Sequence, residues 1–177
     1  MRILFLAEER PVPPDQGDRI RACHLLKELA RRHQVTLLAF SLVRAGAGLT
    51  DRCGLEGVEI VEVPRSPWER WAGVARHPFW PLTAAFRWSP SLGRELKRLV
   101  ARGGFAAAVA YQLKMAPYVV SVKGPRRVVD LTDSVSLYLE RHRPFAPPLR
   151  RVALAWEAWK AKRLERKIGR ASCRERV

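Results

Sequence analysis

Residues 2–42 place one amphipathic segment between two apolar runs, and this order most constrains how the chain can fold. Residues 2–7, RILFLA, are apolar on both faces, which is typical of a strand buried inside a parallel sheet. Residues 18–32 carry Ala and Leu on one side at helical spacing and Arg and Lys on the other. Residues 34–42, QVTLLAFSL, form the second apolar run. A strand, a helix and a strand in this order predict a βαβ unit with parallel strands and a right-handed crossover.

The alternation of strands and helices continues along the chain. The strands expected are 57–63, 105–112 and 126–133, and the helices expected are 91–104, 113–122, 134–143 and a long basic helix from about Leu149. This order predicts the α/β class, with an open, doubly wound parallel sheet of the Rossmann-like kind. We expect residues 1–167 to form one such domain.

Local signals refine three of these helices. Gly103 and Gly104 predict a left-handed C-cap at the end of one helix. Asp133 or Ser134 is a natural N-cap for the helix expected at 134–143. The long basic helix is expected to carry its apolar side on Val152, Ala153, Trp156 and Trp159.

The last ten residues, 168–177, break the pattern of the helix before them. Their sequence, IGRASCRERV, resembles at all ten positions the conceptual translation of a common sequencing adapter. We therefore expect residues 168–177 to be a non-native tail and the native sequence to be cut at about Lys167.

The composition favours a cytoplasmic protein. No apolar run approaches the roughly 18–20 residues needed to cross a bilayer, and the opening apolar run is too short for a secretory signal. Cys23, Cys53 and Cys173 are scattered, without metal-ligand spacing. We expect no metal site.

The chain is strongly basic, with a formal net charge of +16 and a pI of about 11.1. Such a charge favours polyanions: nucleic acid, anionic lipid or phosphorylated small molecules. The basic residues are spread along the chain, which is equally typical of ordinary solvated helix faces in an arginine-rich protein.

The loop from Glu8 to Gly17 is the first candidate site, because it follows the carboxyl end of a predicted strand, where ligands bind in such sheets. Gly17 allows a close approach of the backbone, and the helix start after it offers unpaired N–H groups to an anion. In the structural interpretation, Asp15 or Asp18 only caps the helix and Gly17 only permits a tight turn.

Two nucleotide-binding motifs and two aspartates bear on which ligands the chain can bind. The dinucleotide fingerprint GxGxxG and the phosphate-binding GxxxxGK[ST] are absent, so binding of NAD or ATP in the usual modes is not expected. Asp130 and Asp133 stand at the carboxyl end of a predicted strand, and Asp133 could serve either as a cap or in a site.

Residues 65–90 interleave four tryptophans with arginines. The rings are Trp68, Trp71, Trp80 and Trp88, and the cations are Arg65, Arg70, Arg76 and Arg87. This mixture suits the headgroup layer of an anionic membrane, stacking on single-stranded nucleic acid, or simple cover for one face of the sheet.

The order of these segments resembles the N-terminal half of bacterial GT-B glycosyltransferases of the family 4 type. The resemblance lies in PPDQGDRIRACHLLKELARRHQVTLLAF (13–40), HPFWPLTAAFRWSPSL (77–92), VAYQLKMAPYV (109–119), RRVVDLTDSVSLYLERHR (126–143) and WEAWKAKRLERK (156–167). It covers residues 1–167 and is most specific in the first of these segments.

The resemblance implies a two-domain enzyme with facing Rossmann-like halves. The N-terminal half holds the acceptor, and the C-terminal half binds the nucleotide-sugar donor; transfer needs no metal or other cofactor and retains the anomeric configuration. Six residues on the cleft loops are implied to contact substrate: Gly17, Asp18, Arg19, Gln112, Lys114 and Asp133. The catalytic residues are not identified. The acceptor would be a glycan or a lipid-linked molecule in the synthesis of a surface polysaccharide.

The donor half of the family pattern is missing from this chain, so we expect the chain alone to be inactive and to expose an apolar face. Two alternatives stay open: half of a sugar-nucleotide epimerase, which can share the fold, and a non-catalytic basic module for nucleic acid or an anionic membrane. We regard nucleic acid as the least favoured partner. The parent enzyme is expected in the cytoplasm, in peripheral contact with the inner face of the cell membrane.

Overall fold

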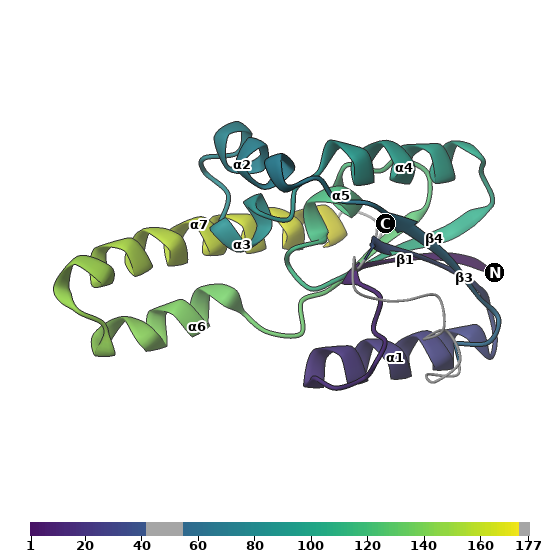
Figure 1. Cartoon of the computed structure of the whole chain (residues 1–177), viewed down its shortest axis with the longest axis horizontal. Coiled ribbons are helices and arrows are strands. Elements are labelled where there is room, and N and C mark those ends of the chain that lie inside the picture. The colour runs from purple at the N-terminus through teal and green to yellow at the C-terminus, as the bar shows by residue number, and fades with distance from the viewer. Residues whose placement is uncertain (42–54, 174–177) are drawn as a thin grey trace.

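The computed structural model describes residues 1–41 and 55–173 and contains a five-stranded sheet in which every neighbouring pair is parallel. The strands are β1 (Arg2–Glu9), β2 (Gln34–Phe40), β3 (Val58–Val63), β4 (Phe105–Tyr111) and β5 (Arg126–Asp130). Their order across the sheet is β3-β2-β1-β4-β5 (Figure 1). This order confirms the predicted α/β class with an open parallel sheet.

Helices cover both faces of the sheet (Figure 1). They are α1 (Gly17–Ala30), α2 (Pro67–Arg76), α3 (Leu82–Ala85), α4 (Pro90–Ala101), α5 (Ala116–Val120), α6 (Val135–His142) and α7 (Pro148–Cys173). A short 3₁₀ turn, Arg143–Phe145, joins α6 to the segment before α7. The arrangement is therefore doubly wound, as predicted.

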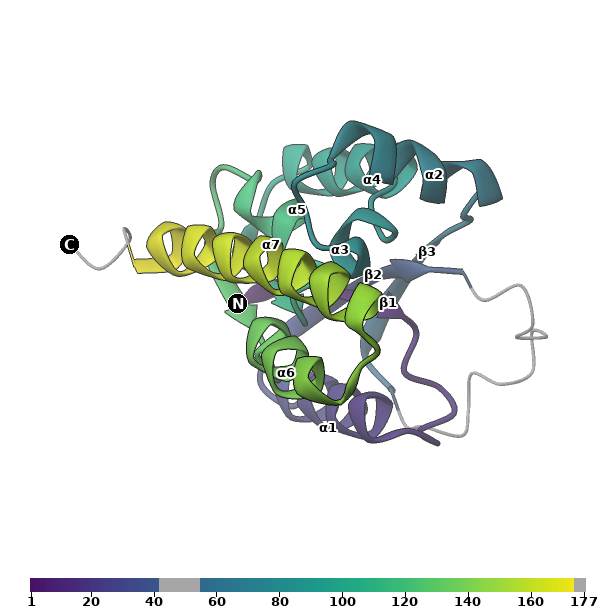
Figure 2. The ribbon, with the colours of Figure 1, turned by 90° about the vertical axis from the view of Figure 1, so that its left-hand side faces the viewer.

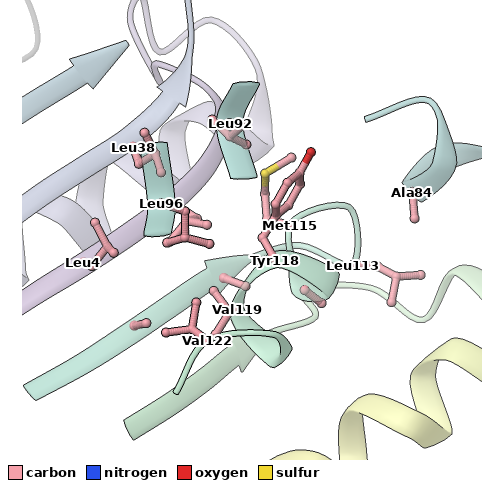
Figure 3. Packing of buried hydrophobic residues seen from close by; sticks show 14 of the residues in the cluster. Leu4, Leu38, Ala84, Leu92, Leu96, Leu113, Met115, Tyr118, Val119 and Val122 are labelled. Carbon is pink, nitrogen blue, oxygen red and sulfur yellow. The ribbon is translucent and has the colours of Figure 1, made fainter. Parts of the chain in front are cut away.

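Alternate side chains of β1 enter two separate cores, because successive residues of a strand point to opposite faces. Leu4 and Leu6 join the core under α4 and α5, whereas Phe5 joins the core under α1. Figure 3 shows Leu92 and Leu96 of α4 beside residues of the first core. Since β1 is central in the sheet, both of its faces must be apolar, which explains the pattern of residues 2–7.

Several local predictions can be checked. Ser134, not Asp133, is the N-cap of α6, and its hydroxyl accepts a hydrogen bond from the Leu137 N–H at 3.3 Å. Gly103 and Gly104 have φ values of 77° and 85°, which confirms the left-handed turn after α4. Position 42 of the expected second strand, Cys53, and residues 174–177 of the tail lie outside the described residues.

The tryptophan-bearing stretch divides into packed and exposed rings. Trp80 stacks on His77 with ring centroids 3.9 Å apart, and Trp88 meets the same imidazole edge-on at 5.2 Å. Trp68 and Trp71 of α2 are exposed. The stretch therefore contributes both to packing and to the surface, instead of serving only one of the predicted roles.

A buried carboxylate fastens this stretch to α4. Glu69 is 2% exposed and accepts hydrogen bonds from the hydroxyls of Ser89 at 2.7 Å and Ser91 at 2.8 Å. Gly73 allows α2 to pack closely against α3, because a Cβ at Gly73 would lie 2.2 Å from the carbonyl oxygen of Ala85. The position of Arg87, which follows α3, is thereby held near the carboxyl edge of the sheet.

The long basic helix begins one residue before the predicted position, and the face that it buries is not the predicted apolar side. Its inner side consists of Ala158, Ala161 and Leu164, while Val152 and Trp156 are exposed. The apolar side predicted from spacing therefore faces water.

The helix continues past Lys167 through Ile168, which is 2% exposed, to Cys173. A continuous helix does not show whether residues 168–177 are native to the protein. Their assignment as a non-native tail therefore stays a prediction. None of the helices within residues 1–41 and 55–173 combines the length and apolar character needed to span a bilayer.

Candidate functional site

A polar pocket of about 290 Å³ lies where β1 and β4 end and α1 begins, at the carboxyl edge of the sheet. We call it the edge pocket. Its lining residues are Ala7, Glu8, Glu9, Pro11, Gln16, Asp18, Arg19, Ala22, Arg87, Tyr111, Gln112 and Lys114. In open parallel sheets ligands bind at this edge, near the point where the connections switch direction. The chain leaves β1 for α1 on one face of the sheet and leaves the neighbouring β4 for α5 on the other, since α1 and α5 pack in different cores.

Two carboxylates orient the guanidinium of Arg19 at one side of the edge pocket. Its Nη2 donates to Glu9 at 2.9 Å, and its Nη1 donates to Asp15 at 2.9 Å. Burial opposes the charge of Arg19, but the hydrogen bonds to Glu9 and Asp15 outweigh burial and raise the pKa of Arg19. Arg19 is therefore held in one orientation with its charge balanced by carboxylates of the chain itself.

A second ion cluster closes the opposite side. Glu8, whose side chain is 14% exposed, forms ion pairs with both Arg87 and Lys114. These three side chains come from the end of β1, the segment after α3 and the loop after β4. One carboxylate thus faces two cations, which leaves a local positive excess next to the pocket.

Tyr111 ties the two strand ends to α1. Its ring stacks on Phe5, with centroids 5.9 Å apart, and its hydroxyl donates to the carbonyl oxygen of Asp18 at 2.8 Å. Burial raises the pKa of Tyr111 above its usual value. The hydroxyl therefore keeps its proton at neutral pH and holds the start of α1 in place.

The residue after Tyr111 has an unusual backbone. Gln112 has a φ of 70°, in the left-handed region that favours glycine, and its N–H donates to the carbonyl oxygen of Asp130 at 2.8 Å. Thr132, after β5, has a φ of 49°. Strained non-glycine backbone at neighbouring strand ends is typical of positions whose side-chain direction matters for function.

The structure brings together four of the six residues that the resemblance assigned to substrate: Asp18, Arg19, Gln112 and Lys114 all line the edge pocket. Gly17 lies between two lining residues, Gln16 and Asp18. It does not make a left-handed turn, and a Cβ built on it would meet no atom within 4 Å. The space in front of Gly17 is therefore open.

Asp133 is exposed and lies outside the edge pocket. It is close to Arg21, whose Nη2 donates to Asp130 at 2.8 Å. The hydrogen bond to Asp130 raises the pKa of Arg21, and Asp133 adds to this effect. Asp133 thus belongs to a neighbouring ion cluster on the α1 side of β5.

The alternative role of Asp15 and Asp18 as caps is not observed. The N-cap of α1 is Gln16, and it makes no side-chain hydrogen bond to the helix. Asp15 binds Arg19, and the carboxylate of Asp18 accepts from the N–H of Arg19 at 2.9 Å. Both carboxylates therefore position the first turn of α1 around Arg19.

Two residues that line the edge pocket, Arg87 and Tyr111, were not predicted for the site. Glu8 and Glu9 fall in the predicted loop from Glu8 to Gly17, but they are the last two residues of β1, and no individual role was predicted for them. Arg87 carries no signal in the sequence, because its position depends on how α2 and α3 pack.

Arg65 adds an unpaired cation nearby. Its side chain is half-buried, and its Nε and Nη2 have no hydrogen-bond partner among the described residues. Burial lowers the pKa of Arg65, and the charges of Arg87 and Arg70 lower it further. The guanidinium lies over the ring of Phe40, 5.1 Å from its centroid, and it does not line the edge pocket.

A larger cavity of about 690 Å³ lies between α4, α5 and α7, lined mainly by apolar groups such as Trp80, Trp88 and Leu96. It lacks the converging ionic groups of the edge pocket. Among residues 1–41 and 55–173, no group of three or more His, Cys, Asp or Glu side chains is arranged to hold a metal ion.

Comparisons with protein-family models, with curated proteins and with solved structures find no match to this chain. A function for this chain can therefore be inferred from the geometry of the edge pocket and from the motif resemblance.

Proposed function

We propose that this chain is the acceptor-side half of a retaining GT-B glycosyltransferase, whose parent transfers a sugar from a nucleotide-sugar donor to a glycan or lipid-linked acceptor. The observation that carries the proposal is that Asp18, Arg19, Gln112 and Lys114 line one pocket at the carboxyl edge of the sheet. These residues come from the first turn of α1 and from the loop after β4, far apart in the sequence, and the motif resemblance assigns both segments to the substrate cleft.

The side chains suit a phosphorylated sugar substrate. Lys114 and Arg87 share the single carboxylate of Glu8, and the positive excess of this cluster can neutralise phosphate oxygens, while Arg19 holds the first turn of α1 beside them. The carboxylate of Asp18 and the amide of Gln112 can accept and donate hydrogen bonds to sugar hydroxyls. These residues bind and orient the substrate; in this proposal the groups that grip the donor nucleotide belong to the second domain.

The proposal places the parent enzyme in the cytoplasm, at the inner face of the cell membrane, where a lipid-linked acceptor would be reached. The net charge of +16 supports contact with anionic lipid. No cofactor is required in this proposal, since the nucleotide-sugar is a substrate.

The decisive experiment begins with adapter-free long reads of the source DNA across codon 167. We expect the frame to continue into a second α/β domain. The full-length enzyme should then release nucleoside diphosphate in the presence of acceptor and form a product with the donor's anomeric configuration. A stop codon directly after Val177 would overturn the proposal for this chain.

Matched variants of the full-length enzyme test the edge pocket itself. Arg19→Gln and Lys114→Met should each lower kcat/KM by about 100-fold, the range for loss of a charge-assisted contact in a binding site. Lys97→Met on α4, an exposed lysine outside the edge pocket, is the control and should leave kcat/KM unchanged. Equal effects of the three variants would contradict the assignment of the pocket. Conversion of the donor to an epimer, without transfer to any acceptor, would favour the epimerase alternative.

A further inference from the structure

The turn between α6 and α7 carries an apolar surface that the rest of the protein does not cover. Its side chains are Phe145, Leu149, Val152, Trp156 and Trp159, which we call the tip surface. Phe145 is 87% exposed, Leu149 is 90% exposed and Val152 is 71% exposed. Isolated exposed apolar residues are ordinary, but a contiguous set of large ones marks an interaction site.

The four residues of the tip surface on α7 form one stripe, because they are spaced three and four residues apart along the helix. Trp156 and Trp159 stack on each other, with ring centroids 4.8 Å apart. The opposite side of α7 is the one that packs on the protein, through Ala158, Ala161 and Leu164. The stripe therefore lies on the side of α7 that faces away from the core.

Polar contacts fix the hairpin in this orientation. Glu165 of α7 accepts a hydrogen bond from the hydroxyl of Ser136 at 2.7 Å and from its N–H at 3.1 Å. Lys162 pairs with Glu140 of α6 at 3.5 Å. Figure 1 shows the hairpin running away from the sheet with the α6–α7 turn at its outer end, and Figure 2 views it from that end. The tip surface is thus presented on a projecting, rigidly held element.

The charges in the segment that joins α6 to α7 and in the first two turns of α7 have a single sign. Between Glu140 and Glu157 the sequence contains no carboxylate. The same segment contains four arginines: Arg141, Arg143, Arg150 and Arg151. A partner that covers this end must therefore offer apolar groups for the stripe and negative charge for its border.

We propose that the tip surface docks on an anionic lipid bilayer, with Phe145 and Leu149 entering the boundary of the acyl chains and the arginines meeting lipid phosphates. Large apolar and aromatic side chains bordered by arginine are the composition that binds this layer. A stable protein interface buries about 800 Å² on each partner, from some 20–30 residues. Five side chains at the outer end of one hairpin form a narrow wedge, which suits insertion into a fluid layer better. The inference names the surface for the membrane contact stated under the proposed function, and it does not depend on sugar transfer itself.

The experiment is vesicle flotation with the full chain. The two probes are vesicles of phosphatidylcholine alone and vesicles of equal parts phosphatidylcholine and phosphatidylglycerol. We expect the chain to float with the second and to remain unbound with the first. A blue shift of tryptophan fluorescence, with quenching by brominated lipid, should accompany binding because Trp156 and Trp159 enter the interface.

Two variants test the tip surface. The double variant Phe145→Ser/Leu149→Ser should weaken binding at least about tenfold through lost apolar insertion. The triple variant Arg141→Gln/Arg143→Gln/Arg150→Gln should weaken it about 100-fold, since each cation near an anionic surface contributes roughly a factor of five. Arg151 is left unchanged because its Nε donates to the carbonyl oxygen of Ala146 at 2.8 Å.

Two controls match these variants in composition. Trp68→Ser/Trp71→Ser removes two exposed apolar rings from α2, and Arg94→Gln/Lys97→Gln/Arg102→Gln removes three exposed cations around α4. Both control variants should bind the anionic vesicles within about twofold of the unmodified chain. Salt in the buffer screens charges that lie away from the membrane, so the cations around α4 contribute little to binding.

Three results would overturn the proposal. The first is the absence of binding to either vesicle. The second is loss of binding in the α2 variant together with normal binding in the tip variants. The third is a concentration-dependent dimer that only the tip variants dissociate, because the tip surface would then pair with a second copy.

Discussion

The edge pocket and the tip surface differ in how far their side chains find partners within the chain. In the edge pocket, ionic side chains are held by partners from other elements: Glu8 by Arg87 and Lys114, and Arg19 by Glu9 and Asp15. At the tip surface, Phe145 and Leu149 are almost fully exposed. The difference shows which region is built by the fold and which one needs something from outside. A ligand entering the edge pocket meets an arrangement already in place, whereas the tip surface gains its contacts only on binding.

Among substitutions in the edge pocket, removal of Glu8 should have the largest effect on stability. Glu8→Ala leaves Arg87 and Lys114 close together without their shared carboxylate, and we expect a loss of about 2 kcal/mol in the free energy of unfolding. Urea denaturation measures this loss. Glu28→Ala is the matched control, because the Glu28–Arg31 pair on α1 is exposed and should contribute no more than about 0.5 kcal/mol. Equal losses would mean that the fold does not depend on the paired charges of the edge pocket.

The strands around the edge pocket were predictable from the sequence, because burial on both faces leaves a continuous apolar run such as residues 2–7. The placement of Gln112 and Lys114 at the same edge follows from the parallel strands that precede them. The pairing of Glu8 with Arg87 was not predictable, since it depends on how the buried Glu69 anchors α2 to α4. Tertiary packing, and not local pattern, determines that contact.

For a related reason, the sequence did not predict which face of α7 is buried. A stripe with Val152 and Trp156 has the periodicity of a core-facing helix, and periodicity alone does not say which side meets the sheet. The buried side consists of small residues, Ala158 and Ala161, which let α7 approach closely. A helix with two apolar sides therefore buries one against the core and leaves the other exposed.

The second prediction concerns the hydrogen bond that closes the edge pocket. Tyr111→Phe keeps the ring against Phe5 but leaves the carbonyl oxygen of Asp18 without the hydroxyl. We expect a loss of about 1 kcal/mol in the free energy of unfolding, measured by urea denaturation. Tyr138→Phe is the control on the hairpin, where the tyrosine is 60% exposed, and should be nearly neutral. A larger loss for Tyr138→Phe would contradict the contrast between the two regions.

The same tyrosine predicts how stability changes at alkaline pH. Burial raises the pKa of Tyr111, and it raises the pKa of Tyr118 still further. Because the unfolded chain loses these protons near pH 10 while the folded chain retains them, stability is complete below about pH 10 and falls as pH rises beyond it. Tyr111→Phe should make this fall shallower. Urea midpoints over the alkaline range measure it, and an unchanged slope would show that Tyr111 titrates alike in both states.

A smaller effect of opposite sign is expected at Gly17. The position has no left-handed φ, and a Cβ there meets no atom within 4 Å, so Gly17→Ala should raise stability by about 0.5 kcal/mol through a less flexible unfolded chain. In the full-length enzyme the added methyl group would occupy the open space beside the edge pocket and raise KM for a substrate that approaches the backbone. The control is Gly57→Ala, where a φ of 80° makes the substitution destabilising. Unchanged KM would mean that the substrate does not approach Gly17.

The smallest effect on stability is expected at the tip surface, although it is expected to have a large effect on lipid binding. Phe145→Ser/Leu149→Ser removes two large apolar side chains that are already in water in the folded chain, so the free energy of unfolding should change by less than about 0.5 kcal/mol. Leu96→Ala on α4 is the contrasting control: Leu96 is 1% exposed, and the truncation should cost about 2–5 kcal/mol. Thermal and urea unfolding of the dilute chain without lipid measure both variants. A loss above about 2 kcal/mol for the tip variant would mean that Phe145 and Leu149 are buried in the folded chain in solution. A near-zero loss in the free energy of unfolding, together with loss of flotation, would show that Phe145 and Leu149 act in membrane binding and not in folding. The edge pocket would then be stabilised by contacts within the chain, and the tip surface by the membrane.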